Sequence, residues 1–138
     1  MRLGISCGAL CLLLTACFGM DRVHYEQLTG PYYLKANDMH EAMFLVRQSK
    51  PDEHYEVAGP GVMRAGFDNR YIVVAVDPLV FESPGQRRPR EYYYVDRAVN
   101  EADRYAEAGI VGPLTFDGFN QHDRRLGLPD FSWSNDGP

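Results

Sequence analysis

Residues 62–77 read VMRAGFDNRYIVVAVD, and this stretch decides the fold. Its first half alternates, with Met63, Ala65 and Phe67 on one face and Val62, Arg64 and Gly66 on the other. Asp68-Asn69 then separates it from a second apolar run over residues 71–76. Asp and Asn tolerate the positive φ that a two-residue turn of the primed type requires. The stretch therefore predicts a β-hairpin with such a turn.

The second strand of this hairpin is apolar on both faces. Tyr71, Val73 and Ala75 point to one side, and Ile72, Val74 and Val76 point to the other. A strand of this kind is buried on both sides. We therefore expect residues 71–76 to lie centrally in a sheet that is covered on both faces.

Shorter patterns on either side predict the remaining elements. Residues 32–36 and 91–95 are typical of strands, and residues 42–46 suit a helix or a strand, with their short, β-branched and aromatic run favouring a strand. Asp96 is a predicted N-cap for a helix that ends at Gly109, with its apolar stripe formed by Ala98, Val99, Ala102, Tyr105 and Ala106. Thr115 is the predicted N-cap of a helix through Leu126, ended by Gly127, with Phe116, Phe119 and Leu126 facing inward. The predicted class is α+β: a single-domain antiparallel β-meander of four to six strands with two C-terminal α-helices.

Four segments are expected along the chain. Residues 1–16 form a cleaved lipoprotein signal peptide, 17–29 a tether, 30–131 the globular domain and 132–138 a flexible tail. The tail carries Trp133, the one residue in it that would dock back onto the domain.

The start of the chain has the pattern of a secretory signal. Basic Arg2 precedes an apolar run over residues 3–14, which is shorter than the about 20 residues that a membrane-spanning helix needs. Leu14-Thr15-Ala16-Cys17 resembles the lipobox of bacterial lipoproteins. The resemblance implies cleavage after Ala16, a diacylglycerol on the Cys17 thiol and an acyl chain such as palmitate on its amine, which together anchor a protein stably.

Lipid attachment implies a place in the cell envelope. In a Gram-negative host, Phe18 after the cysteine resembles the pattern that favours the outer membrane, where the protein would face the periplasm. Cleavage also removes Cys7 and Cys11, so no disulfide is expected in the mature chain.

Composition argues against a nucleic-acid partner. Without residues 1–16 the chain has 122 residues, of which 13 are basic and 19 acidic, a net charge of −6. Affinity for a phosphate backbone rests on clustered positive charge. The basic cluster Arg87, Arg88 and Arg90 would contact an anionic lipid headgroup or an acidic partner, or would simply be a solvated connection.

Catalytic patterns are missing from the sequence, and we predict a non-enzymatic protein without metal or cofactor. His40-Glu41 lacks a second histidine four residues on, because Phe44 stands there, and Asp38 beside His40 reads as a turn residue next to an exposed histidine. No serine occupies a Gly-x-Ser-x-Gly elbow, and the remaining thiol is predicted to be acylated. Tyr92 and Tyr94 share one strand face and are either an aromatic platform for a partner or ordinary core residues.

Several motifs together resemble one family. They are the stretch 30–34 with Asp38, the hairpin 65–73, the run 93–96 and the segment 112–119 with Arg125, Leu126, Leu128 and Pro129. In this spacing they look like a family of short, uncharacterised bacterial envelope proteins, a domain of unknown function. The resemblance covers most of residues 30–131 and implies a single domain without implying an activity.

Two functions follow as hypotheses. The first is a lipid-anchored envelope protein that binds another envelope protein, as immunity proteins against envelope-acting toxins do. The second is a structural or envelope-maintenance lipoprotein that contacts anionic lipid or cell wall through Arg87, Arg88 and Arg90.

Overall fold

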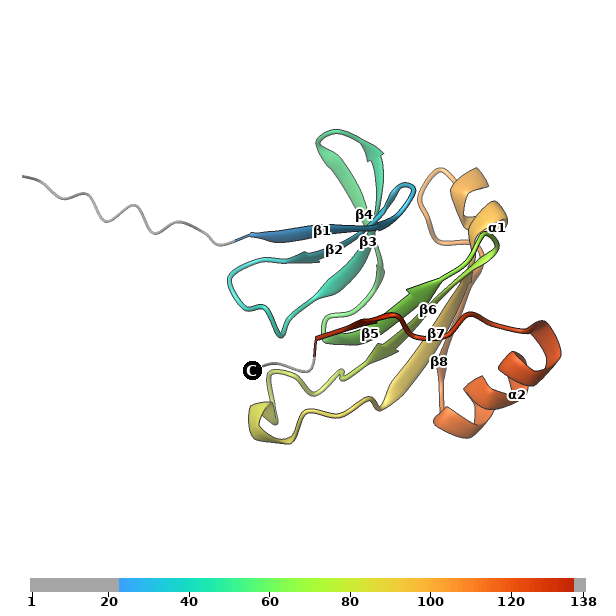
Figure 1. The fold of residues 1–138 in the computed structure, drawn as a ribbon. Helices are drawn as coiled ribbons and strands as arrows, with labels where there is room; N and C mark the ends of the chain where they lie inside the picture. Colours follow the sequence, from blue (N-terminus) through green and yellow to red (C-terminus); the bar gives the residue numbers. More distant parts are fainter. Residues whose placement is uncertain (1–22, 136–138) are drawn as a thin grey trace, which may run out of the picture.

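The computed structural model describes residues 23–135, which form two antiparallel sheets and two α-helices (Figure 1). The first sheet has the order β1-β2-β3-β4 and the second the order β8-β7-β6-β5-β9. The strands are β1 (His24–Thr29), β2 (Tyr32–Ala36), β3 (Phe44–Lys50), β4 (Glu53–Ala58), β5 (Val62–Phe67), β6 (Tyr71–Val76), β7 (Glu91–Asp96), β8 (Ile110–Leu114) and β9 (Trp133–Ser134). The helices are α1 (Arg97–Ala102) and α2 (Phe116–Leu126), with a short 3₁₀ turn at Pro84–Gln86. The α+β class is confirmed.

The predicted hairpin is present as β5 and β6, which pair antiparallel from Val62↔Val76 to Phe67↔Ile72. The prediction of a primed turn was wrong, because neither Asp68 nor Asn69 has a positive φ. Instead the Asp68 carboxylate accepts hydrogen bonds from the backbone N–H groups of Arg70 and Tyr71, at 2.8 and 2.7 Å. A side-chain acceptor of this kind closes a turn without left-handed backbone.

β6 lies centrally in its sheet, as predicted. Its two faces pack into two separate hydrophobic clusters. Ile72, Val74 and Val76 pack with the inner side chains of the first sheet, among them Leu34 and Leu45. Tyr71 and Val73 on the opposite face form a second cluster with residues of β7, α2 and the segment that follows α2. The first sheet and α2 therefore lie on opposite faces of the second sheet (Figure 1).

Residues 24–29 are a strand, so the prediction of a tether over 17–29 was wrong for its second half. β1 pairs antiparallel with β2, Tyr25 opposite Lys35, and only Leu28 of β1 packs against the core. Because this strand lies at a sheet edge, it is held mainly by backbone hydrogen bonds and needs little apolar alternation.

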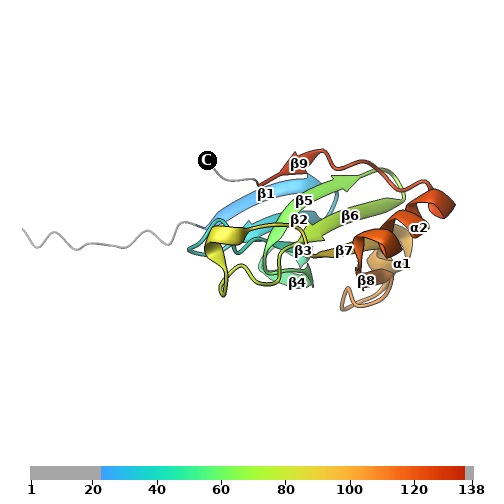
Figure 2. The same ribbon diagram turned by 90° about the horizontal axis from the view of Figure 1, so that it is seen from below.

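The expectation of a flexible tail over 132–138 is also corrected at its start. Trp133 and Ser134 form β9, which pairs with β5 and lies close to β1 (Figure 2). The Trp133 indole packs against the first core and donates to Glu26 Oε2 over 3.3 Å. Trp133 therefore docks back, and it links the C-terminal end of the described chain to both sheets.

The helix predicted after Asp96 begins as expected but ends early, at Ala102. The Asp103 carboxylate accepts hydrogen bonds from the backbone N–H groups of Glu107 and Ala108, which folds the next residues into a loop instead of another turn of helix. The predicted apolar stripe does not form, because Val99 and Tyr105 are exposed.

The second helix has the predicted bounds and both predicted caps. The Thr115 hydroxyl accepts from Gly118 N over 3.1 Å, and Gly127 ends the helix at φ +66°. Phe119 is buried as expected, but Phe116 was placed wrongly and is 59% exposed. Its ring contacts Tyr92 of β7, with centroids 5.5 Å apart, and is otherwise open to solvent.

Gly66 gives a test of how β9 docks. A Cβ at this position would lie 1.9 Å from the Asp130 carbonyl oxygen, so Gly66→Ala must displace the segment leading into β9. We expect a loss of about 2–3 kcal/mol in the free energy of unfolding. Displacement of β9 would also expose the Trp133 indole to water, so the fluorescence emission of the folded Gly66→Ala protein should shift to the red. Trp133 is the only tryptophan, so the signal reports on this residue alone. Urea unfolding followed by this fluorescence measures both effects.

Gly85→Ala is the matched control, because a Cβ there has no neighbour within 4 Å. It should change the unfolding free energy by less than about 0.5 kcal/mol. Equal stabilities for the two variants would contradict the close approach of residue 130 to β5.

Candidate functional site

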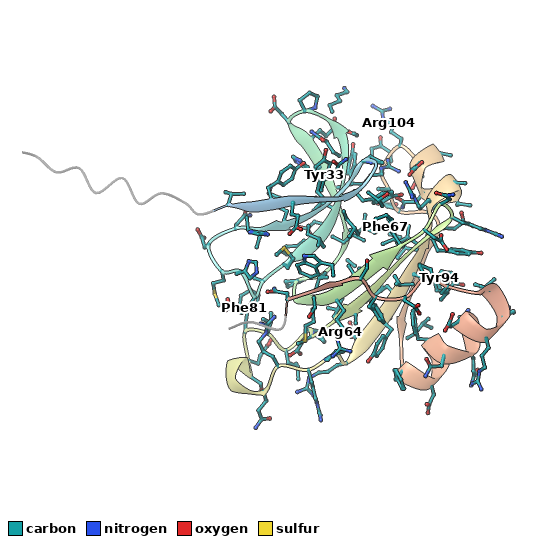
Figure 3. All side chains as sticks on the ribbon, viewed as in Figure 1. Tyr33, Arg64, Phe67, Phe81, Tyr94 and Arg104 are labelled. Atoms are coloured by element: carbon teal, nitrogen blue, oxygen red, sulfur yellow. The ribbon has the colours of Figure 1, made fainter. Side chains whose placement is uncertain are left out.

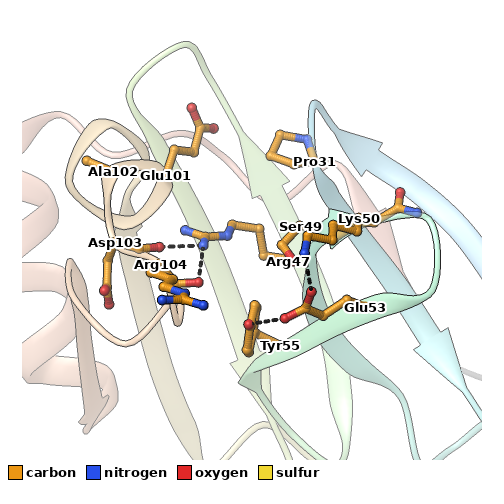
Figure 4. A pocket seen from close by; sticks show the side chains of 11 residues that line it. Pro31, Arg47, Ser49, Lys50, Glu53, Tyr55, Glu101, Ala102, Asp103 and Arg104 are labelled. Carbon is orange, nitrogen blue, oxygen red and sulfur yellow. Dashed lines mark hydrogen bonds and ion pairs between the residues drawn. The ribbon is translucent and has the colours of Figure 1, made fainter.

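A cleft of about 420 Å³ lies between β3 and β4 on one side and the end of α1 on the other (Figure 4). Charged side chains of both signs line it: Arg47, Lys50, Glu53, Glu101, Asp103 and Arg104. It is therefore a polar cleft at the junction of the two halves of the fold.

Arg47 forms the floor of this cleft and is only 5% exposed. Its guanidinium donates to the backbone carbonyl oxygen of Asn100. It also donates to those of Asp103 and Arg104 (Figure 4). The last carbonyls of a helix lack intrahelical partners and carry the negative end of the helix dipole. Arg47 on β3 therefore satisfies the C-terminal end of α1 and joins the first sheet to it.

Asn100 extends this junction into the core, where its side chain is fully buried. Its Oδ1 accepts from the Tyr32 hydroxyl at 2.8 Å, and its Nδ2 donates to the carbonyls of Ala106 and Ala108 at 2.9 and 2.8 Å. Burial raises the pKa of Tyr32 to about 12, so its hydroxyl stays protonated and donates at neutral pH. Both N–H groups of the amide and one of the two lone pairs on its oxygen therefore have hydrogen-bond partners.

The Glu53 and Asp103 carboxylates at the mouth of the cleft both have hydrogen-bond partners. The Tyr55 hydroxyl donates to Glu53, and Lys50 Nζ lies 3.9 Å from the same carboxylate. The hydrogen bond from Tyr55 is the main cause that lowers the pKa of Glu53, and the same bond raises the pKa of Tyr55. The backbone N–H groups of Ala108 and Glu107 lower the pKa of Asp103. The lowered pKa of Glu53 and of Asp103 favours their ionised forms, which suits binding of a cationic or polar group better than proton transfer near pH 7.

A second candidate surface is the outer face of the first sheet, where three rings meet. Tyr25 on β1 stacks on Tyr33 of β2, with ring centroids 4.5 Å apart and an interplanar angle of 9°. The Tyr25 hydroxyl lies 2.9 Å from His54 Nε2 on β4, and Tyr25 is 43% exposed. The main contacts of both helices are with the second sheet, α1 with β7 and α2 with β7 and β8. We call Tyr25, Tyr33 and His54 the aromatic cluster.

Tyr92 and Tyr94, the predicted aromatic platform, are core residues covered by α2. Tyr92 packs on Phe119 with ring centroids 5.4 Å apart, and Tyr94 is buried with its hydroxyl 3.2 Å from His122 Nδ1. Of the two predicted roles of Tyr92 and Tyr94, core packing is therefore the one observed, because α2 lies on this face of the strand.

A buried carboxylate binds one of the three arginines of the basic cluster and leaves the other two without an ion pair among the described residues. Asp77 is fully buried and forms an ion pair with Arg90, whose Nε lies 3.2 Å from Asp77 Oδ1. Asp77 also accepts from the backbone N–H groups of Leu79 and Arg88, at 3.0 and 3.2 Å. Arg90 therefore holds the 77–90 connection in place and is not a free contact residue. Arg88 is exposed and Arg87 partly exposed.

The other predicted sites lie elsewhere or outside the described residues. Leu14, Thr15, Ala16 and Cys17 precede residue 23, so the structure does not describe them. His40 packs edge-on against His24, with ring centroids 4.6 Å apart, and Asp38 has a φ of +55° in the preceding turn. Within residues 23–135, three or more potential metal ligands do not gather at any point. In that same range, the helices are too short and too polar to cross a bilayer.

Sequence reasoning missed the aromatic cluster and the Arg47–Asn100 junction. Tyr25 lies in a polar segment whose sequence predicts a tether. Arg47 and Asn100 are 53 residues apart, so no local sequence pattern joins them. Comparison of the chain with models of protein families, with curated protein sequences and with solved structures finds no match.

The junction is tested by Asn100→Ala. This change leaves the Tyr32 hydroxyl and two carbonyls without their partner in a buried place, so we expect a loss of about 2–4 kcal/mol in unfolding free energy. Urea unfolding measures it. Asn69→Ala, in the exposed turn of the hairpin, is the control and should be nearly neutral. A neutral Asn100→Ala would show that the junction does not hold α1 to the first sheet.

Proposed function

We propose that this chain is a lipid-anchored, non-enzymatic protein of the bacterial cell envelope that binds another envelope protein. The anchor would be the lipid on Cys17, and in a Gram-negative host the domain would face the periplasm from the outer membrane. Immunity proteins and accessory subunits are the classes of binder that fit this description.

The observation that carries the proposal is the aromatic cluster on the uncovered face of the first sheet. Tyrosine combines a large apolar ring with a polar tip, and for this reason it is enriched at protein interfaces and among the residues that dominate their energy. Tyr25 and Tyr33 are already stacked, and the hydroxyl of Tyr25 is held by His54. Little side-chain entropy would therefore be lost when a partner covers them.

The place of the cluster in the chain supports a partner at the envelope. Tyr25 lies eight residues after Cys17, and a chain of that length spans at most about 29 Å. A lipid on Cys17 would keep the aromatic cluster within that distance of the membrane surface. Confinement to a surface raises the effective concentration of a partner in the same membrane, so an interface of moderate affinity suffices.

The anchor is tested first. Metabolic labelling with radioactive palmitate should mark the wild-type protein and leave Cys17→Ser unmarked. Cys11→Ser is the matched control, and it should be labelled like the wild type, because residue 11 lies within the predicted signal. Mass spectrometry should find residues 1–16 absent from the mature protein. An unlabelled wild type would overturn the anchor.

The binding face is tested by photocrosslinking in intact cells. A photoreactive phenylalanine analogue at Tyr25 should give one defined protein adduct, because this ring is exposed on the proposed interface. The same analogue at Phe116, which is more exposed but lies on α2, is the control and should not give that adduct.

Substitution supplies the complementary measurement. Tyr33→Ser should lower the yield of the Tyr25 adduct at least about tenfold, as expected for loss of a central interface tyrosine. Thermal unfolding of the Tyr33→Ser protein would establish that it is still folded. Equal adducts from positions 25 and 116, or none from position 25, would reject the outer sheet face as the binding surface.

A further inference from the structure

Three segments meet at one end of the domain, the end at which β1 begins (Figures 1 and 2). They are the start of β1, the β2–β3 connection and the 77–90 connection. The start of β1 contacts the β2–β3 connection, since the His24 and His40 ring centroids lie 4.6 Å apart. Hydrogen bonds through Gly61 link that connection to the start of the 77–90 connection, since Gly61 N donates to the Met43 carbonyl over 3.0 Å and Asp77 N to the Gly61 carbonyl over 2.8 Å. We call the surface formed by these segments the N-terminal end.

Large apolar side chains are exposed at this end. Val23, Met39, Leu79 and Phe81 all stand on the three segments, and Phe81 is 56% exposed (Figure 3). Leu79 and Phe81 are exposed on a turn that is fixed by its own hydrogen bonds and by a buried side chain. Val80, between Leu79 and Phe81, is buried, and the Leu79 carbonyl accepts from the backbone N–H groups of Glu82 and Ser83 at 3.1 and 2.9 Å.

The same connection carries two cations that the fold does not use in ion pairs. Arg88 is exposed. Arg87 is only partly exposed, with its Nε and Nη2 atoms buried, and Arg90 is occupied by Asp77. Glu82 and Asp38 are exposed at this end as well, so it is not strongly basic. At this end, exposed apolar side chains lie a few residues from arginines along the chain. This composition is typical of surfaces that lie in the headgroup region of a bilayer.

The chain outside the structure decides which occupant fits. Val23 lies six residues after Cys17, and a chain of that length spans at most about 22 Å. A lipid on Cys17 would thus hold the N-terminal end toward the bilayer, while the Arg104 end lies across the molecule (Figure 3). A tethered surface binds at high effective concentration, so a few apolar side chains suffice where they would not recruit a free protein.

From this we infer that the N-terminal end is a bilayer-contact surface: Leu79 and Phe81 enter the boundary between headgroups and acyl chains, and Arg88 contacts lipid phosphates. The inference rests on the proposed lipid anchor and adds an orientation to it. With this end on the membrane, the remainder of the domain, including the cleft at Arg47, faces away from the bilayer.

Quenching by brominated lipid tests the contact. In a Trp133→Phe background, Phe81→Trp places the single fluorophore at the N-terminal end, and Tyr105→Trp places it at a similarly exposed site, 53% exposed, next to Arg104. The full chain is expressed in cells, purified with its lipid and reconstituted into vesicles of phosphatidylcholine and phosphatidylglycerol. Brominated acyl chains should quench the fluorophore at position 81 about twofold or more and leave that at position 105 unchanged, because only the first would lie within the headgroup layer.

The outcomes separate the two proposals. Protein that floats with the vesicles but shows equal quenching at positions 81 and 105 overturns the bilayer contact and keeps the anchor. Protein that does not float overturns both. Flotation together with a protein adduct at position 81 in cells, and no quenching, would assign this end to a protein partner instead.

The role of Arg88 has its own readout. Arg88→Glu should reduce the quenching at position 81 in vesicles that contain phosphatidylglycerol. Arg124→Glu, at an exposed arginine on α2, is the matched charge control and should leave the quenching unchanged. Equal effects of the two variants would remove Arg88 from the contact.

Discussion

Strand β6 is apolar on both faces, and the rest of the fold is arranged to cover it. One face is covered by the first sheet, through side chains such as Leu34 and Leu45. The other is covered by α2 and the segment after it, through Phe119 and Leu128. Neither layer alone would remove the whole strand from water, and burial of apolar area is the largest favourable term in folding. The two sheets and the second helix therefore fold as one cooperative unit around this strand.

Polar junctions then fix how the layers meet. The Arg47 guanidinium satisfies the end of α1, Asn100 ties β2 to the loop after α1, and Asp77 holds Arg90. Apolar contacts are not directional, so they specify that layers pack but not the register in which they pack. Buried hydrogen bonds supply that register, because a shifted arrangement would leave each of these groups without a partner.

The described surface divides into regions of different character. The outer face of the first sheet carries stacked tyrosines held by His54, and the N-terminal end carries apolar tips with Arg87 and Arg88. If the lipid on Cys17 holds that end against the membrane, β1 runs from the bilayer side and carries the aromatic cluster on the side of the domain. The proposed anchor, bilayer contact and protein contact are thus compatible with one orientation of the molecule.

The sequence by itself determined the interior of both sheets, the N-caps of both helices and the C-cap of the second helix. Each interior strand, β2, β3, β5, β6 and β7, was predicted at least in part, as were the caps at Asp96, Thr115 and Gly127. Each edge strand, β1, β4, β8 and β9, was missed. Interior strands need apolar side chains, which the sequence displays, whereas edge strands depend on backbone hydrogen bonds, which every residue type except proline provides. Tertiary structure alone decided that α2 covers Tyr94, that Asp77 takes Arg90 and that Tyr25 meets His54, since those contacts join residues whose separation along the chain carries no periodic signal.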